Sequence, residues 1–486
     1  MKRALAILLS ILLVLAIVLV TRTILLKPQT GSVPAAHPII FDESAAIQRF
    51  AAAIRVPTVS QTGHPIDAEA MSQFCGVLQN SFPRIHAAMT REVLPSGSLL
   101  YTWKGRNPAA DPVILMGHMD VVPVDPATEN RWQHPPFSGD VAEGSIWGRG
   151  TLDDKGSVVA LMEAAETLLA QGFTPARTVI FAFGDDEENG GQQGAAGIVK
   201  LLQARGIHAY FVVDEGGAVA RGFVPGLDSP LAVIGVAEKG YLSLKLSTTG
   251  AGGHSSEPPP HTAIGELAAG LTRLEANPFP GSMPDPTRDE LLSIAPYLPF
   301  AQRLALANLW LTRPVVVATG LKDSKQAGGY QTTTAITMII GGTKDNVLPA
   351  DAQAVVNFRI LPGETVDSVT DRVRSRLNDP KIVISDVDPE QTVNPSPVSP
   401  TNAEGFRTLI TTIRQLYPTA ITAPYLVQAA TDARHYYAVT PNVYRFIPLE
   451  ADENIYTMIH GFNEHITTSN YIHLVEFEAQ LLNNID

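Results

Sequence analysis

The sequence predicts an α/β protein in which a large, mostly parallel, doubly wound sheet accommodates an inserted α+β domain. Three observations lead to this prediction. Short apolar runs alternate with amphipathic helical stretches over residues 41–237, as in a parallel sheet covered by helices. Over residues 238–392 the strands alternate polar and apolar residues, as in an antiparallel sheet with one solvated face. From residue 393 the first pattern resumes, so we expect the smaller domain to lie within the larger one.

The length, charge and cysteine content narrow the possible classes of protein. A chain of 486 residues exceeds one ordinary domain, which favours two folded units. The formal net charge of −13 argues against a nucleic-acid partner, because phosphate binding needs a basic surface. Cys75 is the only cysteine, which excludes an intrachain disulfide and a cysteine metal site. Any metal ligands must therefore be His, Asp and Glu.

The N-terminal segment, residues 1–27, differs from the rest of the chain. Two basic residues precede an apolar run from Ala4 to Val20 that only Ser10 interrupts, and this run is near the lower limit for crossing a bilayer. Thr21 to Thr23 follow where a signal peptide would have a cleavage site. We predict an uncleaved membrane anchor, with a cleaved signal peptide as the alternative, followed by a tether over residues 28–40. The folded body is expected outside the cytoplasm, anchored or secreted, although basic residues on both sides leave the orientation open.

The elements expected in the first part of the large domain follow from hydrophobic periodicity. Helices are expected where apolar residues recur every three or four positions, and buried strands where short apolar runs occur. In chain order we predict helix 43–54, helix 66–80, strand 99–103, strand 113–116, helix 156–169, strand 177–183, helix 194–205 and strand 208–213. Because strands and helices alternate, the strands should be parallel.

The inserted domain is expected to have the element order β-α-β-β-α-β, which is the ferredoxin-like arrangement. The predicted elements are strand 240–248, helix 262–275, strand 332–341, strand 351–361, helix 366–377 and strand 381–387. A Pro-rich insertion from Asn277 to Pro314 interrupts this order. After a linker over 394–402, the large domain is expected to continue with helix 405–416, strand 442–447 and a terminal helix from Tyr471.

Carboxylates recur where the predicted strands of the large domain end. The residues concerned are His118 and Asp120, Asp153 and Asp154 at a helix start, Asp185 to Glu188, and Asp214 and Glu215. In an open α/β sheet, ligands bind in the crevice beyond the carboxyl ends of the strands. Four successive strand ends with acidic residues would repel one another unless cations neutralise them. Oxygen ligands with a few imidazoles suit zinc or a comparable divalent ion.

Each of these groups, taken alone, has a commoner structural explanation. A pair such as Asp153 and Asp154 before a helix usually caps the helix and interacts with its dipole. An acidic run such as Asp185 to Glu188 is usually a solvated loop. Independent structural roles would not, however, select one edge of the sheet, and we therefore predict a metal site.

Five sequence motifs carry a resemblance to a known family. They are Gly-His-Met-Asp-Val-Val (117–122), Trp-Gly-Arg-Gly-Thr-Leu-Asp-Asp-Lys-Gly (147–156), Asp-Glu-Glu-Asn-Gly-Gly (186–191), Val-Asp-Glu-Gly-Gly (213–217) and Ile-His-Gly-Phe-Asn-Glu (459–464). With them the chain resembles, over nearly its whole length after residue 40, the cocatalytic zinc metallopeptidases that include carboxypeptidase S, aminoacylases, bacterial glutamate carboxypeptidase and succinyl-diaminopimelate desuccinylase. It is most similar to the carboxypeptidase S branch, which includes secreted N-fatty-acyl amino acid hydrolases.

The resemblance implies a site for two Zn²⁺ ions, with Co²⁺ or Mn²⁺ as other possible metals. The implied ligands are His118 and Asp214 on one ion, Glu188 and His460 on the other, and Asp153 between both. It also implies that Asp120 orients His118 from behind and that Glu187 is the general base.

The resemblance further implies that the inserted domain is a lid and dimerisation domain of a homodimer. His254 would reach the active site, usually that of the partner subunit, and stabilise the oxyanion. Asn346, Arg359 and Arg434 would hold the substrate carboxylate, a role that suits the planar guanidinium of arginine. Residue by residue, Arg359 could also be an ordinary strand residue and Asn346 a turn former.

The function that follows is a metal-dependent hydrolase that cleaves a peptide or amide bond next to a free carboxylate. Carboxypeptidase S-like cleavage of short peptides and hydrolysis of N-acyl or fatty-acyl amino acids are both compatible with the motifs. A catalytically inactive, membrane-tethered binding protein is a remote alternative, because no expected ligand is missing from the sequence. The insertion over 277–314 could line an acyl site, thicken the dimer interface or shield the lid.

Overall fold

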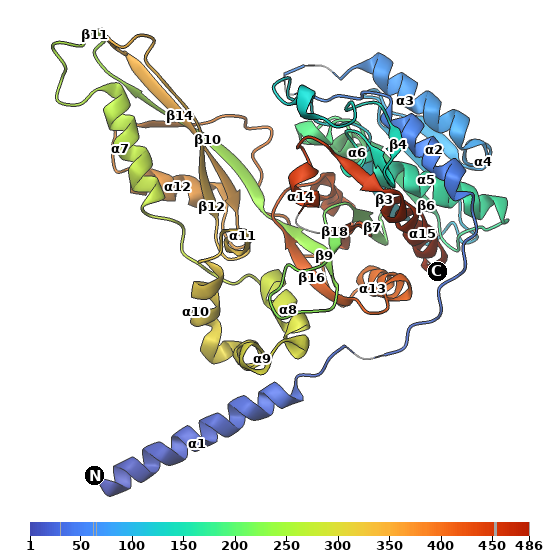
Figure 1. Ribbon diagram of the computed structural model, residues 1–486, viewed down its shortest axis with the longest axis horizontal. Helices are drawn as coiled ribbons and strands as arrows, with labels where there is room; N and C mark the ends of the chain where they lie inside the picture. Colours follow the sequence, from blue (N-terminus) through green and yellow to red (C-terminus); the bar gives the residue numbers. More distant parts are fainter. Residues whose placement is uncertain (30, 62, 65, 452–453, 486) are drawn as a thin grey trace.

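A sheet of ten strands organises the larger part of the molecule (Figure 1). The computed structural model describes residues 1–29, 31–61, 63–64, 66–451 and 454–485. Its strands lie in the order β1 (Thr90–Val93), β2 (Leu99–Trp103), β6 (Val179–Gly184), β3 (Val113–His118), β7 (Phe211–Asp214), β17 (Val443–Arg445), β9 (Leu231–Glu238), β8 (Ala218–Ala220) and β18 (Glu450–Ala451), with β16 (Ile421–Val427) also paired to β9.

The centre of this sheet is parallel, as the sequence predicts. Strands β6, β3, β7 and β17 run in the same direction, and every residue of β3, β6 and β7 is buried. Such continuous apolar strands are typical of a sheet that is covered on both faces. The edges depart from this pattern, because β1 and β2 pair antiparallel and β9 pairs antiparallel with β8 and β17.

Helices cover both faces of the large sheet. One core contains α2 (Glu43–Ile54), α3 (Ala68–Ser81), α4 (Pro83–Ala88), α5 (Lys155–Ala170), α13 (Glu404–Leu416) and α15 (Thr468–Asn484). The other core contains α6 (Ala195–Ala204) and the 3₁₀ segment η4 (Asp432–Ala438). The predicted α/β class is therefore confirmed.

A second sheet, antiparallel throughout, has a core of its own. Its order is β12 (Thr333–Gly341), β14 (Asp351–Ile360), β10 (Gly240–Thr249) and β15 (Val383–Asp386), and α7 (Ala263–Glu275) and α12 (Val366–Leu377) contribute to its core. Along the chain this gives the predicted order β-α-β-β-α-β. A short ribbon of β11 (Gly253–His254) and β13 (Val347–Leu348) lies at the far end of this unit from the large sheet (Figure 1).

Three features differ from the sequence prediction or were absent from it. Strands β9 and β16 were not predicted, although both are apolar and buried. The Pro-rich insertion folds into α8 (Asp285–Ile294), α9 (Phe300–Ala307) and α10 (Leu309–Gly320). Asp153 and Asp154 precede α5, as predicted. They do not follow a strand of the large sheet, because the preceding strand β5 (Ser145–Trp147) belongs to a separate sheet with β4 (Asp140–Ala142) and β19 (His465–Thr467).

The N-terminal helix α1 (Lys2–Leu25) extends away from the rest of the molecule (Figure 1). Of the helices in the described part of the chain, it is the one that is long and apolar enough to cross a membrane, with a mean hydropathy of 3.1 over its most apolar window. No part of that window is buried inside the protein. A helix of this length with exposed apolar side chains all round is typical of a membrane span or of a signal sequence.

A buried ion pair ties together strands that are distant in sequence. Arg445 on β17 donates through Nε to Oε1 of Glu238 on β9 at 2.6 Å, and both side chains are almost fully buried. The same Glu238 oxygen accepts from Thr431, which precedes the segment that carries Arg434. Removing one partner would leave a buried charge without compensation.

We therefore expect Arg445→Gln to destabilise the protein by about 3–5 kcal/mol. The measurement is the urea dependence of unfolding of the full chain in detergent. The matched control is Arg205→Gln, because Arg205 forms a half-exposed pair with Glu92 at 2.5 Å, and such pairs contribute about 0–1 kcal/mol. Equal effects of the two substitutions would contradict a structural role for the buried pair.

Candidate metal centre

Three neighbouring strands of the large sheet deliver acidic residues to one edge. Strand β6 leads into the 3₁₀ turn η2 (Glu187–Asn189), β3 ends at His118, and β7 ends at Asp214. Because these strands are parallel and adjacent, their carboxyl ends meet. The sequence-based expectation that these residues converge is thus met for His118, Glu187, Glu188 and Glu215.

The fourth contribution comes from the N-terminal end of α5, where Asp153 and Asp154 lie. Glu464 holds the preceding loop in place: it accepts from the backbone N–H groups of Gly150 and Leu152, both at 2.9 Å, and from Arg149 at 2.5 Å. Glu464 is fully buried. The motif that contains His460 therefore also positions the loop that carries Asp153.

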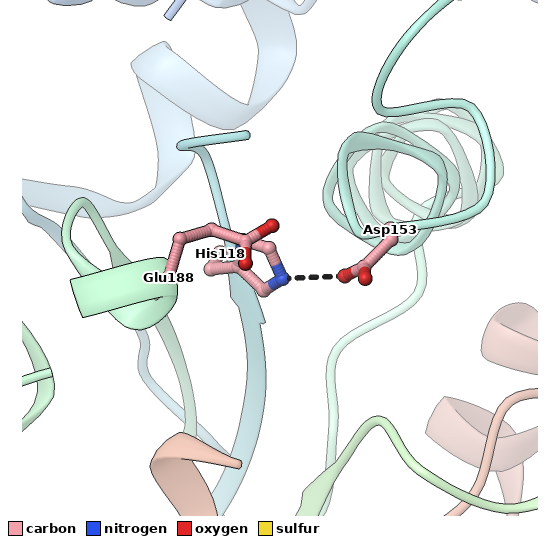
Figure 2. Close-up of side chains that lie close together, drawn as sticks. All are labelled: His118, Asp153 and Glu188. Carbon is pink, nitrogen blue, oxygen red and sulfur yellow. Dashed lines mark hydrogen bonds and ion pairs between the residues drawn. The ribbon is translucent and has the colours of Figure 1, made fainter. Parts of the chain in front are cut away.

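His118, Asp153 and Glu188 form a group of potential metal ligands (Figure 2), one atom from each lying within 4.8 Å of the others. His118 Nε2 lies 2.9 Å from Asp153 Oδ1. The second imidazole, His460, has its Nε2 at 3.1 Å from Asp153 Oδ2 and 3.3 Å from Glu188 Oε2. Asp153 thus contacts both histidines through different oxygens, which is the arrangement expected of a carboxylate that bridges two cations.

His460 approaches this group from a loop with an unusual backbone. Its φ is +59°, in the left-handed region that residues other than glycine seldom occupy. Its side chain is 54% exposed, whereas that of His118 is 2% exposed. One side of the group is therefore buried and the other is open.

Asp120 contacts both His118 and the turn of Glu187 and Glu188. Its two carboxylate oxygens accept from the backbone N–H groups of Glu187 at 3.1 Å and Glu188 at 3.2 Å. Its backbone carbonyl lies 2.9 Å from His118 Nδ1, so that imidazole presents Nε2 toward Asp153. Asp120 accordingly sets both the orientation of His118 and the turn that carries Glu187.

Glu215, rather than Asp214, faces His118. Glu215 Oε1 lies 3.8 Å from His118 Nε2, and His118, Asp154 and Glu215 form a second group of possible ligands within 4.8 Å. Asp214 Oδ2 instead accepts from the backbone N–H of Ala433 at 2.8 Å. Asp214 is the last residue of β7, and Glu215 follows the strand. The ligand role of Asp214 stays a prediction, which now competes with a ligand role for Glu215.

The charges of this group suit a divalent cation. Burial raises the pKa of Glu215 well above its ordinary value, and Asp153 and Asp154 add to the rise. Hydrogen bonds to Asp153 and Glu188 raise the pKa of His460 to about 10. Without a cation, the histidines would have to carry the compensating positive charge.

A carboxylate oxygen without a hydrogen-bond partner also favours a bound cation. Oε1 of Glu188 is buried and has no hydrogen-bond partner among the described residues. A buried carboxylate oxygen without a partner is costly. The donor set of imidazole and carboxylate groups therefore fits zinc or a similar metal ion.

The first two residues of the acidic run have a structural role. Asp185 is buried and accepts from Ser98, and Asp186 accepts from the backbone N–H groups of Gln193 and Gly194, each at 2.8 Å, just before α6. Of the run Asp185 to Glu188, only the last two residues face the metal ligands.

Two arginines from different units of the fold lie close enough for their charges to interact. Arg359 on β14 has its guanidinium carbon 4.8 Å from the centre of the Tyr241 ring, and Arg434 donates to the carbonyl of Gly190 at 2.7 Å. Burial lowers the pKa of Arg359, and the charge of Arg434 lowers it further. Within the described residues, neither guanidinium forms an ion pair with a carboxylate, so both are available to an anion.

His254 and Asn346 lie elsewhere. His254 belongs to β11, at the exposed end of the second sheet, where its Nδ1 lies 2.8 Å from Ser256 Oγ. Asn346 lies beside it and accepts from the backbone N–H of Ser255 at 3.3 Å. The structure does not bring these two residues to the metal ligands of the same chain.

Two residues of the site, Glu464 and Asp432, were not singled out by the sequence, and Glu215 was expected at a strand end without a ligand role. Glu464 stands within the motif over residues 459–464. Asp432 is buried beside Glu187, and neither of its carboxylate oxygens has a hydrogen-bond partner within the described ranges. No local pattern distinguishes Asp432 from an ordinary turn residue.

Comparisons with known proteins agree with this geometry. The model of peptidase family M20/M25/M40 matches residues 114–484. The chain belongs to this peptidase family. It is 39% identical over 422 residues to the probable carboxypeptidase S-like 2 of Dictyostelium discoideum, which covers 85% of this chain and 79% of that protein.

A mammalian relative and a solved structure extend the comparison. The chain is 38% identical over 440 residues to the N-fatty-acyl-amino acid synthase/hydrolase PM20D1 of Mus musculus, covering 89% of this chain and 86% of that protein. The M20 family metallo-carboxypeptidase Sso-CP2 of Sulfolobus solfataricus shares the fold, with a TM-score of 0.68, 18% identity, and coverage of 92% of this chain and 99% of that chain. The protein is a metal-dependent peptidase or amidohydrolase of the M20 family.

The position of Glu215 leads to a prediction about metal content. We expect Glu215→Gln to lower the amount of metal that copurifies with the protein, since it removes a charged ligand. Asp214→Asn is the matched control and should retain metal, because its oxygen contacts Ala433. The measurement is metal per chain by atomic emission spectroscopy. Loss of metal in Asp214→Asn with retention in Glu215→Gln would return the ligand role to Asp214.

Proposed function

We propose that the protein is a two-metal, zinc-dependent hydrolase that cleaves an amide bond on the amino side of a free carboxylate. The observation that carries this proposal is the contact of Asp153 with both His118 and His460. A carboxylate that touches two imidazoles through separate oxygens suits a pair of cations, and Glu188 and Glu215 supply a further carboxylate on each side. When bound, the two cations would act as Lewis acids and lower the pKa of water in the site.

The side chains around the ligands divide the remaining work. The backbone N–H of Glu187 is bound by Asp120, and its carboxylate is not needed as a ligand. Glu187 therefore acts as the general base that accepts a proton from the attacking water. The same carboxyl group then donates this proton to the leaving amine. Burial raises the pKa of Glu187 well above its ordinary value, with Asp432 and Glu188 contributing. A base with a raised pKa holds the proton long enough to transfer it.

Arg359 and Arg434 are proposed to bind the free carboxylate of the substrate. They come from the second sheet and from the large domain, respectively, so a carboxylate between them would draw the two units together. This accounts for two nearby cationic side chains without an acidic partner. The second sheet and its helices would then act as the lid, in accord with the resemblance.

The acyl side of the substrate is less restricted. Cleavage of short peptides, as the name of the Dictyostelium relative suggests, and hydrolysis of N-acyl amino acids, as the name of the mouse relative suggests, share this carboxylate requirement. We propose carboxypeptidase S-like cleavage as the principal activity and N-acyl amino acid hydrolysis as the alternative. A panel of Gly-X dipeptides and N-acyl amino acids of increasing chain length separates the two.

We propose that the protein forms a homodimer through the edge of the second sheet. Strand β12 is an edge strand, and its Met338, Ile339 and Ile340 are all more than half exposed. An exposed apolar edge of this kind is a ready surface for a second copy. Dimerisation there would let His254, which lies far from the metal ligands of its own chain, serve the partner.

The N-terminal helix is proposed to anchor the protein in a membrane, with the catalytic body outside the cytoplasm. The apolar surface of α1 supports this, because its side chains from Leu5 to Leu25 are largely exposed. A secreted form that has lost this segment is the alternative.

Removing the general base should abolish turnover while leaving the metals in place. We expect Glu187→Gln to lower kcat by about 10²–10⁴-fold and to keep the metal content of the natural protein. Glu188→Gln is the matched control, because it removes a ligand and should lose metal as well as activity. Near-normal turnover by Glu187→Gln would refute its role as the base.

Removing the Arg359 guanidinium should affect substrates according to their carboxylate. A charge-assisted hydrogen bond contributes about 1.5–3 kcal/mol, so Arg359→Gln should lower kcat/KM for a Gly-X dipeptide by about 10–150-fold. The C-terminally amidated dipeptide should change little between the two proteins. Equal losses on both substrates would show that Arg359 does not recognise the carboxylate.

A further inference from the structure

Helix α9 packs beside the C-terminal end of α1, and α10 packs on α9 (Figure 1). Asn308, where the two helices meet, donates through Nδ2 to the carbonyl of Leu19 at 3.1 Å and lies 3.4 Å from Thr23 Oγ1. Arg22 donates to the carbonyl of Ala307 at 3.3 Å. Asn308 and Thr23 are both buried, so the N-terminal helix and the Pro-rich insertion are in close packing contact here.

The contact continues beyond the end of α1. Arg303 donates to the carbonyl of Leu26, and Leu26 packs on the apolar cluster that includes Leu231 and Ile421. The Gln29 backbone N–H donates to the Tyr297 hydroxyl at 2.8 Å. The segment that leaves α1 is therefore held against α9 and the large sheet, which sets where α9 and α10 lie along the axis of α1.

In the proposed membrane span, that position falls at the boundary of the bilayer. Arg22 is the first charged residue after the apolar run of α1. Leu19, which Asn308 contacts, lies three residues earlier, or about 4.5 Å toward the apolar side at 1.5 Å per residue. When α1 spans a membrane, the junction of α9 and α10 thus lies at the level where the hydrocarbon meets the headgroups.

The helices expose large apolar side chains at this level. Phe300 is 57% exposed, Trp310 59%, Leu311 47% and Val315 67%. Trp310, Leu311 and Val315 lie on one stretch of α10, and Trp310 is two residues from Asn308. Tryptophan is enriched at the membrane interface, where its ring is partly apolar and its N–H remains hydrated.

We propose that α9 and α10 rest on the surface of the phospholipid bilayer that α1 crosses, with Phe300, Trp310, Leu311 and Val315 inserted at the headgroup level. The neighbouring Lys27 is exposed and can meet lipid phosphates. The insertion is then a second membrane contact, which keeps the body against the surface instead of leaving it free on the tether. This inference rests on the proposed membrane span and is independent of the proposed substrate.

The tryptophans of this chain allow a direct test. The protein has four, and the other three, Trp103, Trp132 and Trp147, are at most 9% exposed and belong to the large domain. Residues 1–27 contain none. In liposomes whose lipids carry bromine on the acyl chains near the headgroup, quenching of tryptophan emission therefore reports on Trp310.

We expect the full chain to lose part of its emission in brominated liposomes relative to unbrominated ones. Trp310→Phe should abolish most of this quenching while keeping its activity on a water-soluble dipeptide. Equal emission in both kinds of liposome would overturn the proposal. Quenching that Trp310→Phe leaves unchanged would overturn it as well.

A charge placed on the same surface provides the second variant. Val315→Glu should reduce the quenching by more than half, because a carboxylate opposes insertion of α10. Val93→Glu is the matched control, since Val93 is 57% exposed on β1 at the opposite end of the large sheet, and it should retain full quenching. Equal quenching in both variants would contradict contact through α10.

An alkaline wash distinguishes failure of the docking from failure of the anchor. A chain that stays in the membrane pellet but shows no quenching refutes the docking surface and leaves the anchor intact. A chain that the wash releases refutes both. If the emission of Trp310 is not quenched and two copies of the chain can be cross-linked through this surface, a second copy covers it. The proposed bilayer contact is then wrong.

Discussion

The site depends on one interaction, the contact of the Asp153 carboxylate with two imidazoles. His118 reaches it from the end of β3, and His460 reaches it from a loop more than 300 residues later in the chain. Around them, Glu188 and Glu215 bring further negative charge into a largely buried space. Such a group of carboxylates is unstable without positive charge, so the metal site and the fold around it are mutually dependent.

Much of the surrounding structure serves to hold these few groups. Asp120 fixes the turn of Glu187 and Glu188, and Glu464 fixes the loop before Asp153. The buried pair of Arg445 and Glu238 ties β17 to β9 and, through Thr431, approaches the segment that carries Arg434. Most of these polar contacts are buried, and hydrogen bonds in such a setting are both strong and specific in geometry. The metal ligands are thus held by a rigid scaffold.

The parts of the protein that meet larger partners are arranged around this scaffold. The second sheet carries Arg359 and exposes the apolar edge of β12. The Pro-rich insertion, which could not be assigned a role from its composition, packs on the end of α1. A substrate carboxylate, a second subunit and a membrane would therefore each engage a different surface of the inserted region.

The sequence by itself determined the α/β class, the alternation of strands and helices and most of the residues in the metal site. These follow from periodicity and from motifs that are local in the chain, and so does the peptidase family. Tertiary structure alone decided three further matters. It placed the Glu215 carboxylate 3.8 Å from the His118 imidazole and directed Asp214 to the backbone N–H of Ala433. It also placed Asp153 just before α5, after a strand of a separate sheet, and set the insertion against α1. These outcomes depend on contacts between residues distant in sequence, and no local pattern encodes them.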